Sequence, residues 1–229
     1  MNYYFLLEDE KSFLKVLPAW LEHMNFKCTR VADIQSIDNN NYVLQSGQGV
    51  TQLITKVLYE TIDTIVYNPG KIDHLVVILD TEQEDEEYRI QQVMDKIAER
   101  YNIEEFDFEI KIFVCNHCFE TWLLGNAEFY PNTVDRNSLF YPYFSHYNIL
   151  ENDPELMNVP MDDDRTIAKY HFQYLHNMFL YNRIRYRKSK PDFVATNSYF
   201  QILKNRAWNT SHISSFRKFV EYIQSQNNL

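Results

Sequence analysis

The sequence predicts an α/β protein in which a mainly parallel sheet is covered by helices on both faces. Apolar runs that do not alternate with polar residues occur at 2–7 and 75–79, and such runs are typical of strands buried on both sides. Segments with apolar residues at every third or fourth position separate these runs, as expected for amphipathic helices. Strand-like and helix-like segments therefore alternate along the first half of the chain, which indicates parallel pairing.

The elements expected up to residue 124 follow the order β-α-β-β-α-β-α-β-α. We expect strands at 2–7, 26–32, 42–45, 75–79 and 108–114. We expect helices at 12–24, which contains Pro18, and at 50–66, 84–101 and 119–124. Asn68-Pro69-Gly70 ends the second helix by its turn chemistry, and the acidic first turn of the third suits the helix dipole.

The pattern changes near residue 131. Residues 132–164 are rich in Asn, Asp, Pro and Tyr, so we expect irregular structure or short helices there. One long helix is expected at 165–187, and two more at 198–207 and 211–224. We therefore expect an α/β domain over 1–130 and a mostly helical C-terminal extension over 131–229 that packs on it.

Composition excludes several classes of protein. With 45% hydrophobic and 16% aromatic residues, the chain is that of a folded protein. It has four glycines and no GxxxxGK[ST] motif, which excludes ATP hydrolysis through a P-loop. A net charge of −10 argues against nonspecific coating of nucleic acid, although a local basic groove stays compatible with it. Three cysteines, no secretion signal and no long apolar run lead us to expect a cytoplasmic protein without a membrane span.

Carboxylates follow two of the predicted buried strands. Glu8 follows the first strand, and Asp80 and Glu82 follow the central one. The carboxyl ends of parallel strands are where open α/β sheets bind ligands, so these side chains can meet there. If the strand conformation continues through Glu82, it and Asp80 point the same way. Such a group suits Mg²⁺ or Mn²⁺, with further oxygens offered by Asp9, Glu10, Glu84 and Asp85.

The alternative for the run 80–87 is a solvated, N-terminally charged helix start, and the pattern alone favours the two interpretations about equally.

A second segment also contains residue types that carry chemistry. Cys115 and Cys118 form a CxxC spacing with His117 between them, and Glu120 follows two residues later. No second pair at zinc-site spacing accompanies it, so we favour both cysteines as small buried hydrophobes.

These residues together carry a resemblance to a known family. The segment 116–124, Asn-His-Cys-Phe-Glu-Thr-Trp-Leu-Leu, resembles the N-P-C-F-E-x-W-L-L pattern of the Toprim-type domains of RloB-like proteins and their OLD-type relatives. His117 stands where that family usually has Pro. Asp9 replaces the Gly of its E-G-x-x-[TD]-E motif, and Asp80-Thr-Glu82 replaces its common Asp-x-Asp.

The resemblance covers about residues 2–130 and implies a Toprim fold with an Mg²⁺-dependent nuclease-like site. Glu8, Asp80 and Glu82 would then be the metal ligands, and Glu120 is the family-matched acidic residue, either structural or a further catalytic residue of the site. Relatives are often encoded beside ABC- or OLD-type ATPases in antiphage defence, and some act as toxin effectors on RNA or DNA. The implied partners are therefore a nucleic acid, such an ATPase and further copies of the chain in a homo-oligomer. The alternative is a non-catalytic Toprim-like binding or sensor subunit of an ATPase complex.

A basic run at 183–190 is a local exception in this acidic chain. Its Arg183, Arg185, Arg187 and Lys188 are candidates for contacts with nucleic-acid phosphates, with an interleaved Tyr that could stack on a base. An equally weighted alternative is a helix C-terminus stabilised by cations beside its dipole. Two further cations near the acidic groups, Lys11 and Arg89, either neutralise a bound phosphate or pair with neighbouring carboxylates.

Overall fold

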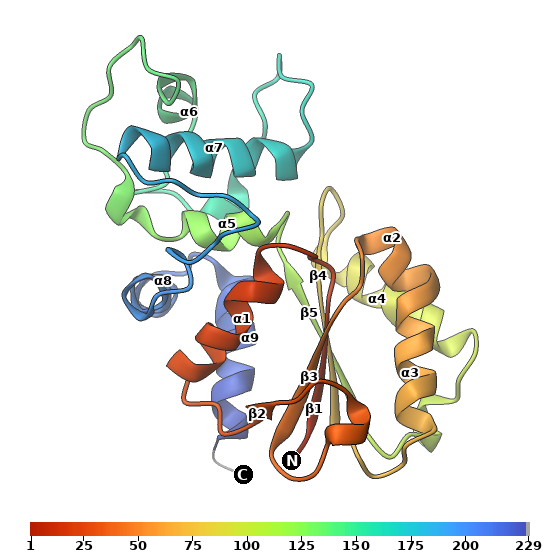
Figure 1. The fold of residues 1–229 in the computed structure, drawn as a ribbon. Helices are drawn as coiled ribbons and strands as arrows, with labels where there is room; N and C mark the ends of the chain where they lie inside the picture. The colour runs from red at the N-terminus through yellow and green to blue at the C-terminus, as the bar shows by residue number, and fades with distance from the viewer. Residues whose placement is uncertain (228–229) are drawn as a thin grey trace.

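The computed structural model describes residues 1–227 and shows an α/β architecture with a single parallel sheet (Figure 1). The strands are β1 (Tyr3–Leu7), β2 (Thr29–Arg30), β3 (Asn41–Ser46), β4 (His74–Asp80) and β5 (Glu109–Cys115). They are ordered β2-β3-β1-β4-β5, and every neighbouring pair is parallel. The predicted fold class is confirmed, and the expected second strand shrinks to two residues at the sheet edge.

Helices occupy both the connections between strands and the C-terminal third. They are α1 (Phe13–His23), α2 (Val50–Gln52), α3 (Leu58–Val66), α4 (Glu86–Ala98), α5 (Phe119–Leu124), α6 (Tyr141–His146), α7 (Ile167–Tyr181), α8 (Asn197–Asn209) and α9 (Ser214–Gln226). A π-helical segment, Leu53–Val57, joins α2 to α3 where we expected one regular helix. Within residues 1–227, no helix has both the length and the apolar character needed to cross a membrane.

The sheet is buried on both faces because its strands are apolar at consecutive positions. Along β1, Tyr3, Phe5 and Leu7 point into one apolar cluster, while Tyr4 and Leu6 point into the other. Helices α1 and α9 cover the first face, and α3 and α4 cover the second (Figure 1). This arrangement is why the sequence of β1 is an unbroken apolar run.

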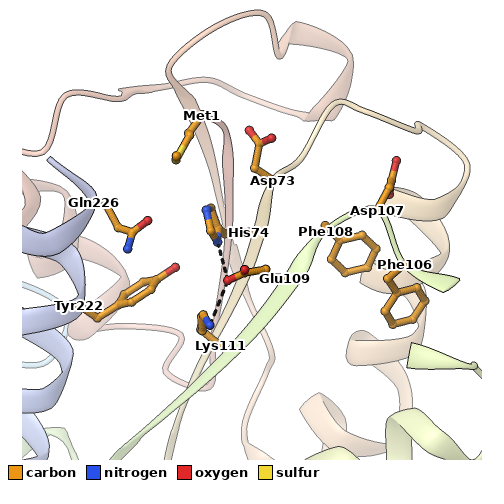
Figure 2. A pocket seen from close by; sticks show the side chains of 10 residues that line it. All are labelled: Met1, Asp73, His74, Phe106, Asp107, Phe108, Glu109, Lys111, Tyr222 and Gln226. Carbon is orange, nitrogen blue, oxygen red and sulfur yellow. Dashed lines mark ion pairs between the residues drawn. The ribbon is translucent and has the colours of Figure 1, made fainter. Parts of the chain in front are cut away.

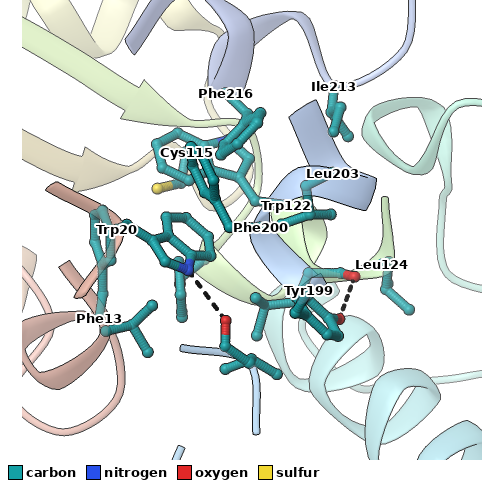
Figure 3. Packing of buried hydrophobic residues seen from close by; sticks show 14 of the residues in the cluster. Phe13, Trp20, Cys115, Trp122, Leu124, Tyr199, Phe200, Leu203, Ile213 and Phe216 are labelled. Atoms are coloured by element: carbon teal, nitrogen blue, oxygen red, sulfur yellow. Dashed lines mark hydrogen bonds between the residues drawn. The ribbon is translucent and has the colours of Figure 1, made fainter. Parts of the chain in front are cut away.

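The C-terminal helices share the core of the first face. Figure 3 shows aromatic side chains from α1, α5, α8 and α9 packed in one cluster. Polar groups inside it are hydrogen-bonded: Trp20 Nε1 donates to the Val194 carbonyl at 3.0 Å, and Tyr199 OH donates to the Leu123 carbonyl at 2.7 Å. The region 131–227 therefore packs on the sheet, and the last two residues of the predicted extension lie outside the described residues.

The connections leave β1 and β4 toward opposite faces of the sheet. The chain passes from β1 into α1 on the first face and from β4 into α4 on the second. In open α/β sheets, a ligand crevice forms at the carboxyl ends of neighbouring strands whose connections diverge in this way. Helices α5 and α7 lie beyond this end of the sheet (Figure 1). The topology therefore indicates that a ligand-binding site would lie at the carboxyl ends of β1 and β4.

The single long helix expected at 165–187 is wrong. Helix α7 ends at Tyr181, and the basic run after it is not helical apart from the turn that closes the helix. Arg183 adopts a left-handed φ of 61°, the Arg183 amide donates to Leu180 and the Ile184 amide donates to Phe179. These are the two hydrogen bonds of a Schellman motif, which normally places Gly at the left-handed position. The sequence does not predict this helix ending, because Arg183 stands at the left-handed position where Gly would be the usual signal.

Phe219 on α9 tests whether the C-terminal helix is part of the core. Its fully buried ring stacks on Trp122, with ring centroids 5.8 Å apart and planes inclined by 20°. We expect Phe219→Ala to lower the free energy of unfolding by about 3–5 kcal/mol in urea, because the truncation leaves a cavity. Leu139→Ala is the control, since Leu139 is 73% exposed and its truncation should cost little. A Phe219→Ala variant as stable as the parent would show that α9 packs loosely.

Candidate active site

Glu8 and Asp80 lie side by side at the carboxyl ends of β1 and β4. These strands are neighbours in the sheet, with Leu7 paired to Ile78. The Glu8 amide donates to the Ile78 carbonyl at 2.9 Å, and the Asp80 amide donates to Glu8 Oε2 at 2.7 Å. The two residues predicted to meet across the sheet are therefore joined by one direct hydrogen bond.

Glu120 approaches the same place from the first turn of α5. Its side chain is almost fully buried, and its charge contributes to raising the pKa of Asp80. Lys188 Nζ lies 3.0 Å from the Glu120 carboxylate, and Tyr186 OH donates to Glu120 Oε1 at 3.3 Å. Three carboxylates from three separate elements thus border one acidic region.

The loops that follow β4 and β5 hold α5 in this position. The Thr81 amide donates to Cys115 O at 3.1 Å, the Glu82 amide to His117 O at 2.9 Å, and the His117 amide to Thr81 Oγ1 at 2.7 Å. Glu82 and His117 both adopt left-handed backbone conformations, with φ of 56° and 67°. Backbone strain of this kind persists only where surrounding contacts enforce it, and here the three hydrogen bonds do so.

Positive charge compensates the acidic region only in part, because Lys188 pairs with Glu120 and no cationic side chain within residues 1–227 forms an ion pair with Glu8 or Asp80. Burial, and then the charge of Glu82, raises the pKa of Glu8 to about 7 from its usual 4.5. Burial, followed by the charges of Glu8 and Glu120, raises the pKa of Asp80 well above its ordinary value, and Lys188 only partly opposes this. Carboxylates that repel one another in this way are stabilised by a bound cation.

The donor chemistry of Glu8 and Asp80 fits a hard divalent cation. The Asp80 carboxylate accepts no hydrogen bond from the described residues 1–227. Mg²⁺ is commonly held by one or two carboxylates and keeps several of its waters. No group of three or more His, Cys, Asp or Glu side chains within that range is arranged to hold a metal ion. The residues present therefore offer a two-carboxylate site rather than a closed cage.

Glu82 does not extend the strand beside Asp80. Because β4 ends at Asp80 and Glu82 is left-handed, the condition under which both side chains point the same way is not met. Glu82 is exposed and instead lines a cavity of about 230 Å³ together with Arg89 and Thr166. Arg89 is buried, and its guanidinium donates to the Thr81 carbonyl at 3.0 Å and to Gln92 at 2.7 Å.

Two of the spare acidic side chains serve as helix caps. The Asp9 carboxylate accepts hydrogen bonds from the amides of Lys11, Ser12 and Phe13 at the start of α1, and Asp85 accepts one from Tyr88 at the start of α4. Capping satisfies amides that a helix start leaves unpaired. Asp9, the residue that departs from the Gly of the resembled motif, therefore has a structural role of its own.

The basic run contributes two side chains to the acidic region, and its three arginines and Lys190 lie at the surface. Tyr186 and Lys188 point inward to Glu120, whereas Arg183, Arg185 and Arg187 are exposed. An antiparallel bridge between Arg187 and Lys190 closes the segment. The contact of Tyr186 and Lys188 with Glu120 was not predicted, because the sequence pattern indicates a helix through residue 187.

The other predicted residues stay near the surface or in the core. Lys11 is exposed on the loop after β1, and only its backbone amide takes part in capping α1. Cys115 and Cys118 are buried free thiols, and burial raises the pKa of both well above the usual value, so they stay protonated. They behave as the small hydrophobes that we expected.

The raised pKa of Glu8 makes stability depend on pH. A carboxyl group whose pKa rises on folding binds a proton more tightly in the folded chain, so stability falls as pH increases from about 4.5 to about 7. We expect Glu8→Gln, measured with a chelator present, to reduce this decline, leaving the part due to Asp80, and to stabilise the protein at pH 8 by roughly 1–3 kcal/mol. Glu10→Gln, at an exposed neighbouring position, should leave the pH profile unchanged. A Glu8→Gln variant with the parent's profile would show that Glu8 is charged in the folded state at pH 5.

Comparison with known proteins identifies no relative. The sequence matches no protein-family model, and neither the curated proteins nor the solved structures contain a significant match. The resemblance to Toprim-type domains therefore stays a prediction from the motifs, and the function has to be argued from the geometry of the acidic region.

Proposed function

We propose that the protein is a metal-dependent nuclease that hydrolyses phosphodiester bonds in RNA or DNA. The observation that carries the proposal is the direct hydrogen bond of 2.7 Å between the Asp80 amide and Glu8 at the carboxyl ends of adjacent parallel strands. Glu120, matched to the acidic residue of the resembled family, borders the same region. The raised pKa values of Glu8 and Asp80, two adjacent carboxylates, are characteristic of functional sites.

In this proposal Glu8 and Asp80 hold Mg²⁺ or Mn²⁺, and Glu82 joins them only if its loop rearranges. The bound ion would orient the phosphodiester and stabilise the charge that develops during phosphoryl transfer. Lys188 keeps the buried Glu120 charge neutralised, and Tyr186 orients the same carboxylate by its hydrogen bond. The exposed Arg183, Arg185 and Arg187 belong to the same segment and supply contacts for the substrate backbone.

The biological setting of the proposal comes from the motif resemblance. It is an effector of an antiphage defence module in the cytoplasm, working with an ABC- or OLD-type ATPase. The chain has no P-loop of its own, so coupling to nucleotide hydrolysis requires such a partner.

A second function, a non-catalytic binding or sensor subunit of an ATPase complex, is favoured by three observations. Lys188 and Tyr186 already donate hydrogen bonds to the Glu120 carboxylate, which makes it less available to a metal ion or substrate. His117 adopts a φ of 67°, which the Pro of the resembled motif could not adopt because its ring fixes φ near −65°. The net charge of −10 suits docking to a basic partner.

Nuclease assays with transfer RNA, other RNA and DNA in the presence of Mg²⁺ test the leading proposal. We expect cleavage by the parent and a loss of at least about 100-fold in Glu8→Gln and in Asp80→Asn, since even residues that only orient metal ligands typically matter 10- to 100-fold. Glu84→Gln, at an exposed position outside the pair, should cleave normally. Cleavage that survives both substitutions would assign the activity to another site.

Calorimetry and chromatography separate the two functions. A catalytic protein should bind Mg²⁺ or Mn²⁺ at the Glu8–Asp80 site in the absence of nucleic acid. No metal binding and no cleavage, combined with a stable complex with an ATPase on size-exclusion chromatography, would favour the binding subunit.

If the three exposed arginines contact phosphates, the affinity for nucleic acid should fall as the salt concentration rises, and each arginine should add to that dependence. Each phosphate contact releases counterions, so changing Arg183, Arg185 and Arg187 together to Gln should lower the slope of log K against log salt by about 2–3. The readout is fluorescence anisotropy with Ca²⁺ replacing Mg²⁺ to prevent cleavage. Arg30→Gln, on the exposed edge strand β2, is the control. An unchanged slope in the triple variant would remove the basic run from the interface.

A further inference from the structure

A separate cavity lies at the amino ends of the strands, at the opposite end of β4 from Asp80. Its volume is about 640 Å³, within the range of small-molecule sites, and it is bordered by the starts of β4 and β5 and by the end of α9 (Figure 2). His74, the first residue of β4, and Tyr222 of α9 line it from one side. This cavity shares no residue with the acidic region around Glu8.

Two polar atoms in the cavity wall have no hydrogen-bond partner among residues 1–227. They are His74 Nδ1 and Tyr222 OH, both inaccessible to water. His74 is only 9% exposed, and its Nδ1 lies 3.7 Å from Glu109 Oε2, which is too long for a hydrogen bond. Burial lowers the pKa of His74, so the ring is neutral at pH 7 and one of its nitrogens is an acceptor. Buried polar atoms without partners are rare in native proteins and point to a missing ligand or water.

The charges around the cavity are unbalanced. The carboxylates of Asp73, Asp107 and Glu109 border it, and of these Glu109 is neutralised by Lys111 at 3.0 Å. The Asp73 and Asp107 side chains accept backbone amides, from Asn2 and from Gly70, and face no cationic side chain within 4 Å in the described part of the chain. With the Met1 ammonium and Lys111 set against Asp73, Asp107 and Glu109, the cavity carries one net negative charge.

Aromatic groups form the remaining wall. Phe106 and Phe108 stack on each other with centroids 4.6 Å apart, and the His74 ring lies between Tyr3, 4.9 Å away and nearly parallel, and Tyr222, 6.4 Å away and edge-on. Aromatic faces attract organic cations through their quadrupoles and cover the apolar part of such a ligand. They give no such attraction to an inorganic anion.

From this combination we infer that the cavity binds a small organic cation with several N–H donors, of the amine or guanidine class. Its cationic groups pair with Asp73 and Asp107 at the mouth, and once the Tyr222 side chain moves aside an N–H group bonds to the ring nitrogen of His74 or to the Tyr222 hydroxyl. The inference does not rest on the proposed nuclease function, because the two sites lie at opposite ends of the sheet.

Calorimetry with agmatine, a linear guanidine with a terminal amine, tests the inference on the full chain with a chelator present. We expect one agmatine per chain and at least tenfold weaker binding in the double variant Asp73→Asn/Asp107→Asn, in which the side-chain carbonyls that accept backbone amides are kept. Tyr222→Phe should weaken binding about threefold and leave the fold intact, because it removes only the hydroxyl. Glutarate, an anion of similar length, should not bind.

Two control variants test whether agmatine binds at this cavity and at no other acidic surface of the protein. Glu87→Gln/Glu104→Gln removes the same charge from exposed positions outside the cavity and should bind agmatine like the parent. Asp80→Asn should also bind like the parent, since it disables only the acidic region at the other end of β4. The inference is overturned if the parent does not bind agmatine at 10 mM, or if the Asp73/Asp107 variant binds agmatine as tightly as the parent. It is also overturned if the Glu87/Glu104 variant loses as much affinity as the Asp73/Asp107 variant. Loss of binding in Asp80→Asn would assign the agmatine site to the acidic region instead.

Discussion

The hydrogen bond from the Asp80 amide to Glu8 is the constraint on which the functional end of the molecule depends. It holds a carboxylate from β1 against the exit of β4, where burial disfavours both charges. A fold keeps such a pair only if the rest of the structure offsets its cost. Here the sheet is sandwiched between two apolar clusters, so β1 and β4 cannot separate to relieve the repulsion without exposing the core.

The C-terminal third completes this end of the sheet. It supplies Lys188 and Tyr186, whose side chains donate hydrogen bonds to the buried Glu120 carboxylate. The segment that carries these two residues also contacts α1. Lys15 on α1 donates to the Ser189 carbonyl at 2.6 Å, which fastens the basic segment to the helix that follows Glu8. Contacts with the acidic region therefore come from residues about 180 positions apart, and the C-terminal part bears directly on the chemistry that this region can perform.

The strands and most helices could be predicted from the sequence because their signals are local. An unbroken apolar run such as 75–79 predicts a buried parallel strand, and carboxylates after two such runs predict that Glu8 and Asp80 meet once the strands are neighbours. Three features could not be predicted: two are decided by long-range contacts, and one is a local helix ending that lacks the usual Gly. Glu82 turns away because its amide bonds to His117, α7 stops at a left-handed Arg183 without the usual Gly, and Lys188 finds Glu120 across the fold. The cavity at His74 also has no sequence signal, because its groups come from four distant segments.

The most direct measurement of the central claim is the anomalous scattering of Mn²⁺ soaked into crystals of the protein. If the crowded carboxylates at the ends of β1 and β4 form a metal site, a peak should lie within about 2.3 Å of oxygens from both Glu8 and Asp80, and it should disappear in crystals of Asp80→Asn. No peak at that position in saturating Mn²⁺, or a peak that persists without the Asp80 carboxylate, would contradict the claim.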